Sequence, residues 1–183
     1  MPLTFTPTAI PGVILVEPTV FPDARGAFYE GYRRDVFAAQ GIPDFVQDNY
    51  NVSAKGVVRG LHYQVPPKAQ GKLIRVLRGA IYDVAVDIRR GAPTFGRWVG
   101  VTLEPTTAKA LYIPAGFAHG FCALEEETVV MYKVTDFYSP AHERGVRWDD
   151  PALGIAWPAL DRPHQVSDRD RQYPLLKDAA LFS

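Results

Sequence analysis

Prolines and glycines divide this chain into short segments. The sequence contains 16 prolines and 15 glycines, and they are spread along its whole length. The segments between them leave little room for the crossover helices that parallel strands need, whereas antiparallel strands can be joined by turns of a few residues. This punctuation predicts an all-β protein built from many short antiparallel strands.

The segments between the turns carry the apolar patterns of β-strands. Strands are expected at residues 12–21, 26–32, 45–53, 56–64, 72–77, 80–88, 97–103, 109–114, 117–124 and 128–138. Residues 33–43 predict a helix that stops at Gly41. A helical turn is expected after Asp149 or Asp150, with Pro151 at its first position. We predict a jelly-roll barrel with a few short peripheral helices, forming a single domain over residues 1–183.

Charge and cysteine content exclude several classes of protein. Lys+Arg and Asp+Glu both total 20, so the chain lacks the basic balance of a nucleic-acid-binding protein. A single cysteine, Cys122, can form neither an internal disulfide nor a cysteine metal cluster. The first residues lack a secretory signal pattern, and no apolar run reaches the ~18 residues of a membrane helix. A cytoplasmic enzyme or binding domain with no membrane partner is therefore expected.

The four histidines, His62, His119, His142 and His164, raise the question of a metal site. Metal-binding jelly rolls commonly place two histidines two residues apart on one strand, but here His62 is followed by Gln64. Two histidines without added carboxylates are too few for a tight transition-metal site. The sequence therefore predicts a site without metal.

His62 and Arg59 lie in one predicted strand, with Gly60 between them. In a regular strand the two side chains would point to opposite faces. A glycine inside a strand often marks a bulge, which shifts the alternation by one residue and would bring both side chains to one cavity. The residues alone do not decide between this arrangement and one in which His62 is a core histidine and Arg59 lies on the surface.

Lys72, Tyr132 and His119 are further candidates for chemistry. Lys72 begins a strand with an apolar face, so it is either a charge at a strand end or a cation directed at an oxyanion. Tyr132 shares a face with Val130 and Val134, where it is either a structural tyrosine or a general acid in a polar cavity. His119 is expected to be a packed, structural histidine unless another residue is shown to pair with it.

Asp170 has two readings. Ser167 precedes it by three residues, as in a helix capping box, although Glu or Gln is the usual residue there. The functional reading is a carboxylate that orients a catalytic His62. Asp83 is a second candidate partner for a histidine, and sequence spacing does not decide between them.

Several motifs in order carry a resemblance to a known family. They are "FVQDN", "VVRGLHYQ", "QGKLIRVLRGAIYDVAVDIRRGAPTFGRWVG", "IPAGFAHGF", "YKVTDFYSP" and "WDDPALGIAWP". From about Ile10 to Leu176 the chain resembles the dTDP-4-dehydrorhamnose 3,5-epimerases. The resemblance implies a metal-independent cupin jelly roll without a cofactor. It also implies a homodimer with exchanged strands, whose pocket is built from both chains.

The resemblance implies a reaction and roles for its catalytic residues. The expected substrate is dTDP-4-dehydro-6-deoxy-D-glucose, inverted at C3 and C5 through enolates to give dTDP-4-dehydro-L-rhamnose. His62 matches the family's base and Asp170 the carboxylate that pairs with it. Tyr132 matches the acid, and Lys72 the cation beside the enolate oxygen.

Further positions match residues that hold the nucleotide sugar. They are Arg25, Phe28, Glu30, Gln47, Asp48, Asn49, Arg59, His119, Tyr138, Glu143 and Arg169. The resemblance implies that Arg25 and Glu30 reach the nucleotide from the partner subunit, and that Phe28 and Tyr138 stack on thymine. Arg169 stands where many members have lysine, so the charge is kept and the contact geometry differs.

The alternatives come from the same superfamily and from other classes. A mono-epimerase acting at C3 or C5 only would use the same base and tyrosine, and a 3,4-ketoisomerase is a more distant relative. A metal cupin lacks support because the His-x-His pair is missing. A non-catalytic sugar-nucleotide binder would not need base, acid and lysine together.

Overall fold

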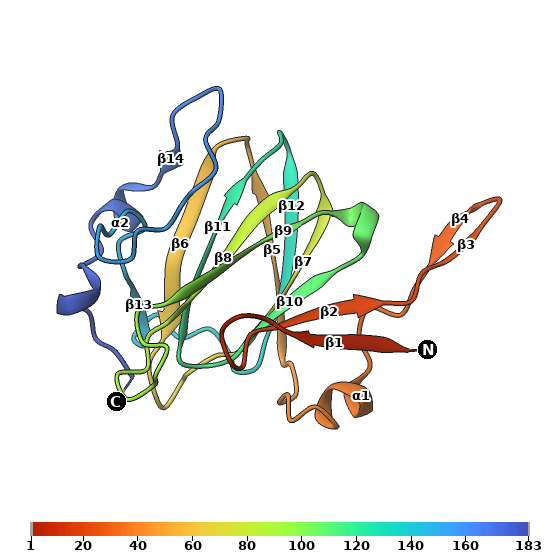
Figure 1. Ribbon diagram of the computed structural model, residues 1–183, viewed down its shortest axis with the longest axis horizontal. Coiled ribbons are helices and arrows are strands. Elements are labelled where there is room, and N and C mark those ends of the chain that lie inside the picture. The colour runs from red at the N-terminus through yellow and green to blue at the C-terminus, as the bar shows by residue number, and fades with distance from the viewer. Residues whose placement is uncertain (1, 183) are drawn as a thin grey trace.

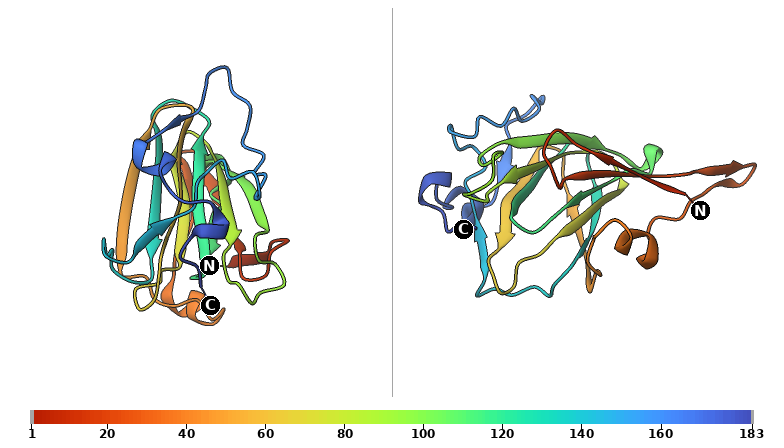
Figure 2. Two further views of the ribbon diagram at one scale, coloured as in Figure 1. Left: turned by 90° about the vertical axis from the view of Figure 1, so that its left-hand side faces the viewer. Right: turned by 60° about the horizontal axis from the view of Figure 1, so that its bottom comes forward.

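The computed structural model describes residues 2–182. Two sheets lie face to face, and a thin two-stranded arm projects from one side of the body (Figure 1). The turned views in Figure 2 show the two layers edge-on and the arm extending away from them. This arrangement is the predicted antiparallel jelly roll.

The first sheet has six strands, ordered β1-β2-β10-β7-β12-β5, all antiparallel to their neighbours. Its strands are β1 (Leu3–Pro7), β2 (Ile14–Pro18), β5 (Gln47–Ser53), β7 (Lys72–Arg78), β10 (Ala110–Ile113) and β12 (Thr128–Val134).

The second sheet runs β13-β6-β11-β8-β9, and β14 adds to β6 in parallel. Its strands are β6 (Val57–Gln64), β8 (Ile81–Asp87), β9 (Trp98–Leu103), β11 (Phe117–Ala123), β13 (Glu143–Gly145) and β14 (Gln165–Val166). The projecting arm consists of β3 (Phe21–Asp23) and β4 (Gly26–Phe28). The helices are α1 (Arg34–Ala38) and α2 (Asp168–Arg171), and the 3-10 turns are η1 (Pro105–Thr107) and η2 (Leu176–Asp178).

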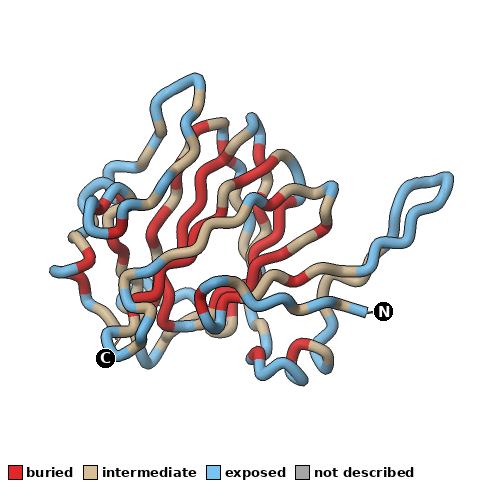
Figure 3. The backbone as a smooth tube through the Cα atoms, in the orientation of Figure 1, coloured by how far each residue is buried: buried red, intermediate tan, exposed pale blue. Residues whose placement is uncertain are grey.

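The main core lies between the two sheets. Ile74 and Val130 from the first sheet pack in one buried cluster with Ile81, Ala85 and Phe121 from the second. Figure 3 shows the buried residues concentrated along these central strands, whereas the arm is exposed. Burial of apolar surface between the sheets is the main force that holds the two layers together.

The C-terminal segment covers the outer face of the second sheet. Leu61, Val84 and Val86 are buried there against residues such as Val146 and Leu176. Strand β8 is therefore buried on both faces, which explains why apolar residues predominate in residues 80–88, although the face of Ile81 and Ala85 also carries the buried Asp83 and Asp87. The same packing holds the segment that carries α2 against β6.

Each segment predicted as a strand contains one in the structure. Strands β1, β13 and β14 were not predicted, and of β3 only Phe21 lies in a predicted segment; β3, β13 and β14 have three, three and two residues, which is too short to produce a readable alternation. The predicted first helix is α1, and the chain turns at Gly41, which has a φ of +73°.

The predicted helical turn near Pro151 is a turn and not a helix. Asp150 rather than Asp149 caps it, because the Asp150 carboxylate accepts hydrogen bonds from the Ala152 and Leu176 amides, at 2.8 and 2.6 Å. Asp149 instead pairs with Arg147. Asp150 thus ties the turn to the C-terminal segment.

Candidate active site

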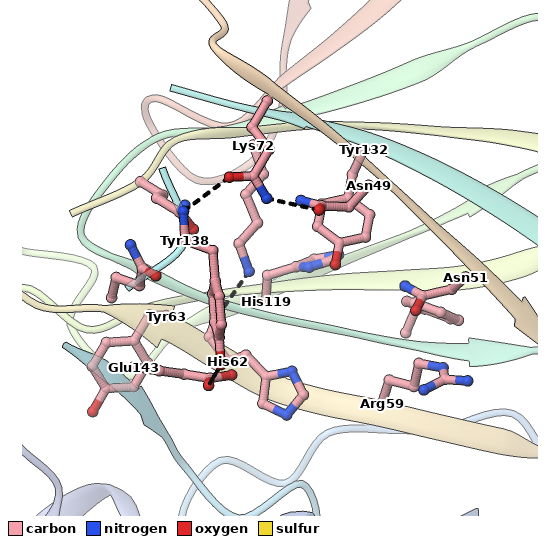
Figure 4. A pocket seen from close by; sticks show the side chains of 14 residues that line it. Asn49, Asn51, Arg59, His62, Tyr63, Lys72, His119, Tyr132, Tyr138 and Glu143 are labelled. Atoms are coloured by element: carbon pink, nitrogen blue, oxygen red, sulfur yellow. Dashed lines mark hydrogen bonds between the residues drawn. The ribbon is translucent and has the colours of Figure 1, made fainter. Parts of the chain in front are cut away.

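A polar cavity of about 360 Å³ opens between the two sheets. Figure 4 shows the side chains that enter it. The first sheet contributes Gln47, Asn49, Asn51, Lys72 and Tyr132, the second contributes Arg59, His62, Tyr63, Gln64, His119, Phe121 and Glu143, and Gln70 and Tyr138 come from loops. Basic, acidic and amide groups therefore converge on one space from both layers.

A bulge at Gly60 brings Arg59 and His62 to this cavity. In the register of β6 and β11, His62 lies opposite His119 and Arg59 lies opposite Phe121. An advance of three residues along β6 is therefore matched by only two along β11, which means that β6 has one extra residue there. Gly60 has a φ of +129°, and a Cβ there would lie 2.5 Å from the Gly120 Cα, so only glycine fits. The predicted bulge is confirmed, and with it the shift in alternation.

The imidazole of His62 is held by Asp170. The distance from His62 Nε2 to Asp170 Oδ1 is 2.7 Å, and Oδ2 of the same carboxylate accepts the Gly60 amide at 3.2 Å. Burial alone would raise the pKa of Asp170, but the hydrogen bond to His62 and the charge of that ring keep it below the ordinary value. An ionised carboxylate only accepts, so Nε2 carries the proton and Nδ1 is the basic nitrogen.

The structure places Asp170 in contact with both residues that the two readings name, Ser167 and His62. Ser167 is the N-cap of α2, and its hydroxyl accepts the Asp170 amide at 3.1 Å. The backbone of Asp170 is thus capped while its side chain turns toward His62. The cap fixes the direction in which the carboxylate leaves the helix.

Asp83 serves the other histidine of the cavity. Its Oδ1 lies 2.7 Å from His119 Nε2, and both residues are buried. Burial lowers the pKa of His119, although Asp83 opposes this effect. His119 is therefore a partnered and neutral imidazole, whereas His62 stands at the cavity with Asp170 behind it.

Lys72 points into the cavity. Its Nζ donates to the His62 carbonyl oxygen at 3.2 Å (Figure 4). Burial lowers the pKa of the Lys72 ammonium to about 8, with the charges of Asp83 and Glu143 acting in the opposite direction. The group is a cation at neutral pH, in a place where its charge is poorly solvated and interacts strongly with any anion.

Tyr132 enters the cavity from the sheet opposite to that of His62. Its ring stands on β12, and Figure 4 shows it across the cavity from the imidazole. Burial raises the pKa of its hydroxyl, which therefore stays protonated at neutral pH. A proton donor and a proton acceptor thus face the same space from two sides.

A second group of polar residues surrounds the cavity entrance. Tyr138 donates to Glu143 Oε2 at 2.6 Å, and Arg169 donates to the same oxygen. Burial would raise the pKa of Glu143, but these hydrogen bonds keep it lowered. Gln47 is linked to Asn49 at 2.8 Å and accepts the Tyr138 amide.

Asp48 does not face the cavity. Strand β5 alternates, so Gln47 and Asn49 line the cavity while Asp48 is exposed and pairs with Lys133 at 2.8 Å. The structure therefore does not bring Asp48 together with its neighbours in the "QDN" motif. The reason is the two-residue period of a regular strand.

Arg25, Phe28 and Glu30 also lie away from the cavity of their own chain. They belong to the arm and to the stretch that follows it. Phe28 is 61% exposed, and the Arg25 guanidinium pairs with Asp23. Within one chain the structure thus gives these three residues no place at the site.

Sequence reasoning missed several residues of the site. Asn51 continues the alternation of Gln47 and Asn49, a signal that could have identified it. Tyr63, Gln70 and Phe121 line the cavity without a distinctive pattern. Tyr173, outside the cavity lining, packs against His62.

Within residues 2–182, no group of three or more His, Cys, Asp or Glu side chains is arranged to hold a metal ion. Over the same part of the chain, no helix has the length and apolar character needed to span a bilayer.

A family model and a similar protein from another organism assign this chain to the same family. The family model described as dTDP-4-dehydrorhamnose 3,5-epimerase matches residues 7–178. The enzyme of that name from Pseudomonas aeruginosa is 53% identical over 179 residues, which is 97% of this chain and 98% of the relative.

Solved structures of relatives have the same fold. The dTDP-6-deoxy-D-glucose-3,5-epimerase of Legionella pneumophila, solved with dTDP-4-keto-L-rhamnose, matches with a TM-score of 0.92 and 44% identity, over 96% of this chain and 94% of that one. A 3'-monoepimerase from Streptomyces bikiniensis, solved with dTDP-quinovose, matches with a TM-score of 0.87 and 39% identity, over 93% and 87%. The motifs, the paired histidine and aspartate facing a tyrosine, and these matches together make the chain a member of the dTDP-4-dehydrorhamnose 3,5-epimerase family.

Proposed function

We propose that this protein inverts C3 and C5 of dTDP-4-dehydro-6-deoxy-D-glucose to give dTDP-4-dehydro-L-rhamnose. One observation carries the proposal within the family: His62 with Asp170 behind it, and Tyr132 on the opposite sheet, face one cavity that also holds Lys72. Inversion of a carbon requires removal of a proton from one face and delivery to the other. The site offers a group for each task.

The proposed chemistry begins at the acidic hydrogens beside the C4 ketone. His62 Nδ1 takes the proton from C3 or C5, and the electron pair of the broken C–H bond moves onto the C4 oxygen as an enolate. Lys72 stabilises that oxyanion, because a fixed cation in a poorly solvated site interacts strongly with developing charge. Tyr132 then donates its proton to the same carbon from the other face, and the new C–H bond has inverted configuration.

The remaining residues are proposed to bind the nucleotide sugar. The guanidinium of Arg59 suits the diphosphate, and it is held by Ser53 Oγ at 3.0 Å. His119 is proposed to contact the sugar-diphosphate part. Gln47, Asn49, Glu143, Tyr138 and Arg169 are proposed to complete the binding surface, with the Tyr138 ring stacked on thymine. Asp48 is not included, since it faces away from the cavity.

We also propose a homodimer in which the arms are exchanged. The arm projects from the body (Figure 1). Phe28 on the arm is exposed, and so are Tyr50 and Val52 on β5, the strand at the opposite edge of the first sheet from β1. Exposed apolar side chains on a projecting segment and on a sheet face are typical of an interface between subunits. Arg25, Phe28 and Glu30 of one protomer would then reach the nucleotide in its partner's cavity.

Two further expectations stay proposals. The protein is proposed to act in the cytoplasm, with the dTDP-sugar as its partner molecule. Its residues 1–183 are proposed to form one domain, which the single core shared by both sheets supports.

The test is isotope exchange with the proposed substrate. The protein is incubated with dTDP-4-dehydro-6-deoxy-D-glucose in deuterated water, and the label at C3 and C5 is read by NMR. Each inversion delivers a solvent-derived proton, so label at both carbons is expected. Because a relative in the comparison is a monoepimerase with the same fold, label at one carbon only would replace the double epimerase by that activity. No label at either carbon would overturn both.

A further inference from the structure

An aromatic ring that the proposed mechanism does not use stands beside the catalytic base. The centroid of the Tyr173 ring lies 5.6 Å from that of the His62 imidazole, with the ring planes at 68°. Tyr173 follows α2, so the same short segment supplies both the carboxylate that binds Nε2 and the ring that contacts the imidazole. Tyr173 does not belong to the lining of the cavity.

The fold makes room for this ring at Gly145. Residue 145 pairs with His62 across β13 and β6, and a Cβ there would lie 2.5 Å from both Cδ2 and Cε2 of Tyr173. The φ of Gly145 is not among the positive values, so its backbone does not itself require glycine. The space that a side chain at residue 145 would fill is occupied by the Tyr173 ring.

The hydroxyl of Tyr173 contributes little to this arrangement. It is buried and makes no well-formed hydrogen bond among residues 2–182, although the nearby Arg169 guanidinium opposes the rise in its pKa that burial causes. A buried hydroxyl without a partner costs free energy rather than supplying it. The contact with His62 therefore depends on the ring of Tyr173.

We propose that Tyr173 is a positioning residue for His62. One hydrogen bond to Asp170 fixes the position of Nε2 but leaves the imidazole free to tilt, because rotation about the Cβ–Cγ bond of histidine has a broad minimum. The Tyr173 ring prevents the imidazole from tilting toward one side and so keeps Nδ1 directed toward the sugar. This inference rests on the proposed function, in which His62 is the base.

The first test compares two substitutions at residue 173. Tyr173→Leu removes the aromatic ring, and kcat for epimerisation is expected to fall about tenfold or more, since small misplacements of a catalytic group are costly. The fall in kcat should exceed any rise in the KM for the dTDP-sugar, because Tyr173 does not line the cavity and is linked to the binding surface only through the contact of its ring with the Arg169 guanidinium. Tyr173→Phe keeps the ring and should restore the wild-type kcat, with thermal stability at least equal to that of wild type.

The second test displaces the Tyr173 ring by a substitution at its neighbour, Gly145. Gly145→Ala adds a methyl group where the ring stands, so it should lower kcat by displacing Tyr173. In the Tyr173→Leu background the added methyl meets a smaller side chain, and its further effect on kcat should be much smaller. This non-additivity is expected only if both substitutions act through one contact.

A matched glycine and tyrosine far from the cavity provide the control. A Cβ at Gly100 would lie 2.1 Å from the Tyr82 hydroxyl, and neither residue lines the site. Tyr82→Leu and Gly100→Ala should change the melting temperature and leave kcat near the wild-type value. They show what loss of a Gly–Tyr contact does when His62 is not involved.

The outcomes separate this inference from the proposed function. If wild type incorporates no deuterium at C3 or C5, the proposed function fails and the role of Tyr173 in it fails too. If wild type is active and Tyr173→Leu keeps its kcat, only the positioning role is overturned. Equal losses in Tyr173→Leu and Tyr173→Phe, or additive effects with Gly145→Ala, would also overturn it, since the ring would not be the group that acts.

Discussion

At the scale of single residues, the two histidines of the cavity differ in what surrounds them. His119 is 7% exposed, its Nε2 lies 2.7 Å from Oδ1 of the buried Asp83, and burial lowers its pKa. His62 stands at the cavity with one nitrogen bound to Asp170 and the other available. A base must exchange protons with substrate and solvent, and that requirement distinguishes His62 from His119.

Loss of the base should abolish exchange at both carbons. In His62→Ala, the incorporation of deuterium at C3 and at C5 is expected to fall by about 10²- to 10⁴-fold, the usual contribution of a positioned general base. NMR of the sugar after incubation in deuterated water measures both. Exchange at one carbon at the wild-type rate would mean that a different residue serves that carbon.

Loss of the acid should have a different signature. Tyr132→Phe removes the proton donor and leaves His62 in place, so proton abstraction should be impaired less than inversion. The ratio of exchanged but uninverted sugar to inverted product, read by NMR, is expected to rise above that of wild type. Full activity of Tyr132→Phe for both inversions would show that Tyr132 is not the acid.

The charge of Lys72 predicts a basic limit to activity. Burial lowers its pKa to about 8, so the ammonium is charged below that pH and is lost as the pH rises through about 8. The pKa of Tyr132 is raised, so the acid keeps its proton over this range. The value of kcat/KM should therefore fall above about pH 8. Lys72→Arg stays charged and should lose this fall; a profile that is flat through pH 8 in wild type would contradict the role.

At the scale of elements, the bulge of β6 is what joins the anion-binding and the catalytic side chains. Without the extra residue, Arg59 and His62 would lie on opposite faces of the sheet. The bulge depends on two glycines in contact, since a Cβ at Gly120 would lie 2.7 Å from the Arg59 carbonyl oxygen, just as one at Gly60 would meet Gly120. The local backbone thus determines the composition of the site.

Substitution of Gly60 should therefore be costly. Gly60→Ala places a Cβ 2.5 Å from the Gly120 Cα at a φ of +129°, and the free energy of unfolding is expected to fall by about 2 kcal/mol or more. Chemical denaturation measures it. Gly91→Ala is the matched control, since a Cβ there meets nothing within 4 Å. Equal stabilities of the two variants would contradict the account of the bulge.

At the scale of the whole molecule, acid and base stand on different layers of the jelly roll. Tyr132 belongs to the first sheet and His62 to the second, so the distance between them is set by the core that separates the layers. The base in turn depends on the C-terminal segment, which carries Asp170 and packs on the outer face of the second sheet. The arm extends away from all of these parts, as Figure 2 shows.

The proposed exchange of arms predicts complementation between inactive chains. A His62→Ala protomer keeps an intact arm, and an Arg25→Ala/Phe28→Ala protomer keeps an intact base. Random mixing of two such inactive proteins should restore about a quarter of wild-type activity, because half of the dimers are mixed and each holds one complete site. Refolding the two variants together and assaying epimerisation measures this. A monomer by light scattering, or no recovery, would contradict the exchange.

The fold class, most strand positions and the central catalytic candidates could be predicted from the amino-acid sequence alone. Turn residues and alternating apolar side chains act within a few residues of chain, so they can be read locally. The order of the motifs between residues 10 and 176 was sufficient to recognise the family resemblance. Gly60 also signalled its bulge, because a glycine in a strand has few other reasons to be there.

The contacts between residues far apart in the sequence became known only from the folded chain. Sequence spacing did not decide whether Asp170 or Asp83 is the main histidine partner, because the contact between Asp170 and His62 joins residues 108 positions apart. That Asp48 points away from the cavity of its own chain depends on which face of β5 turns toward the cavity. The contact of Tyr173 with His62 depends on the packing of the C-terminal segment. Such pairings follow from how distant segments are brought together by burial, and no local pattern records them.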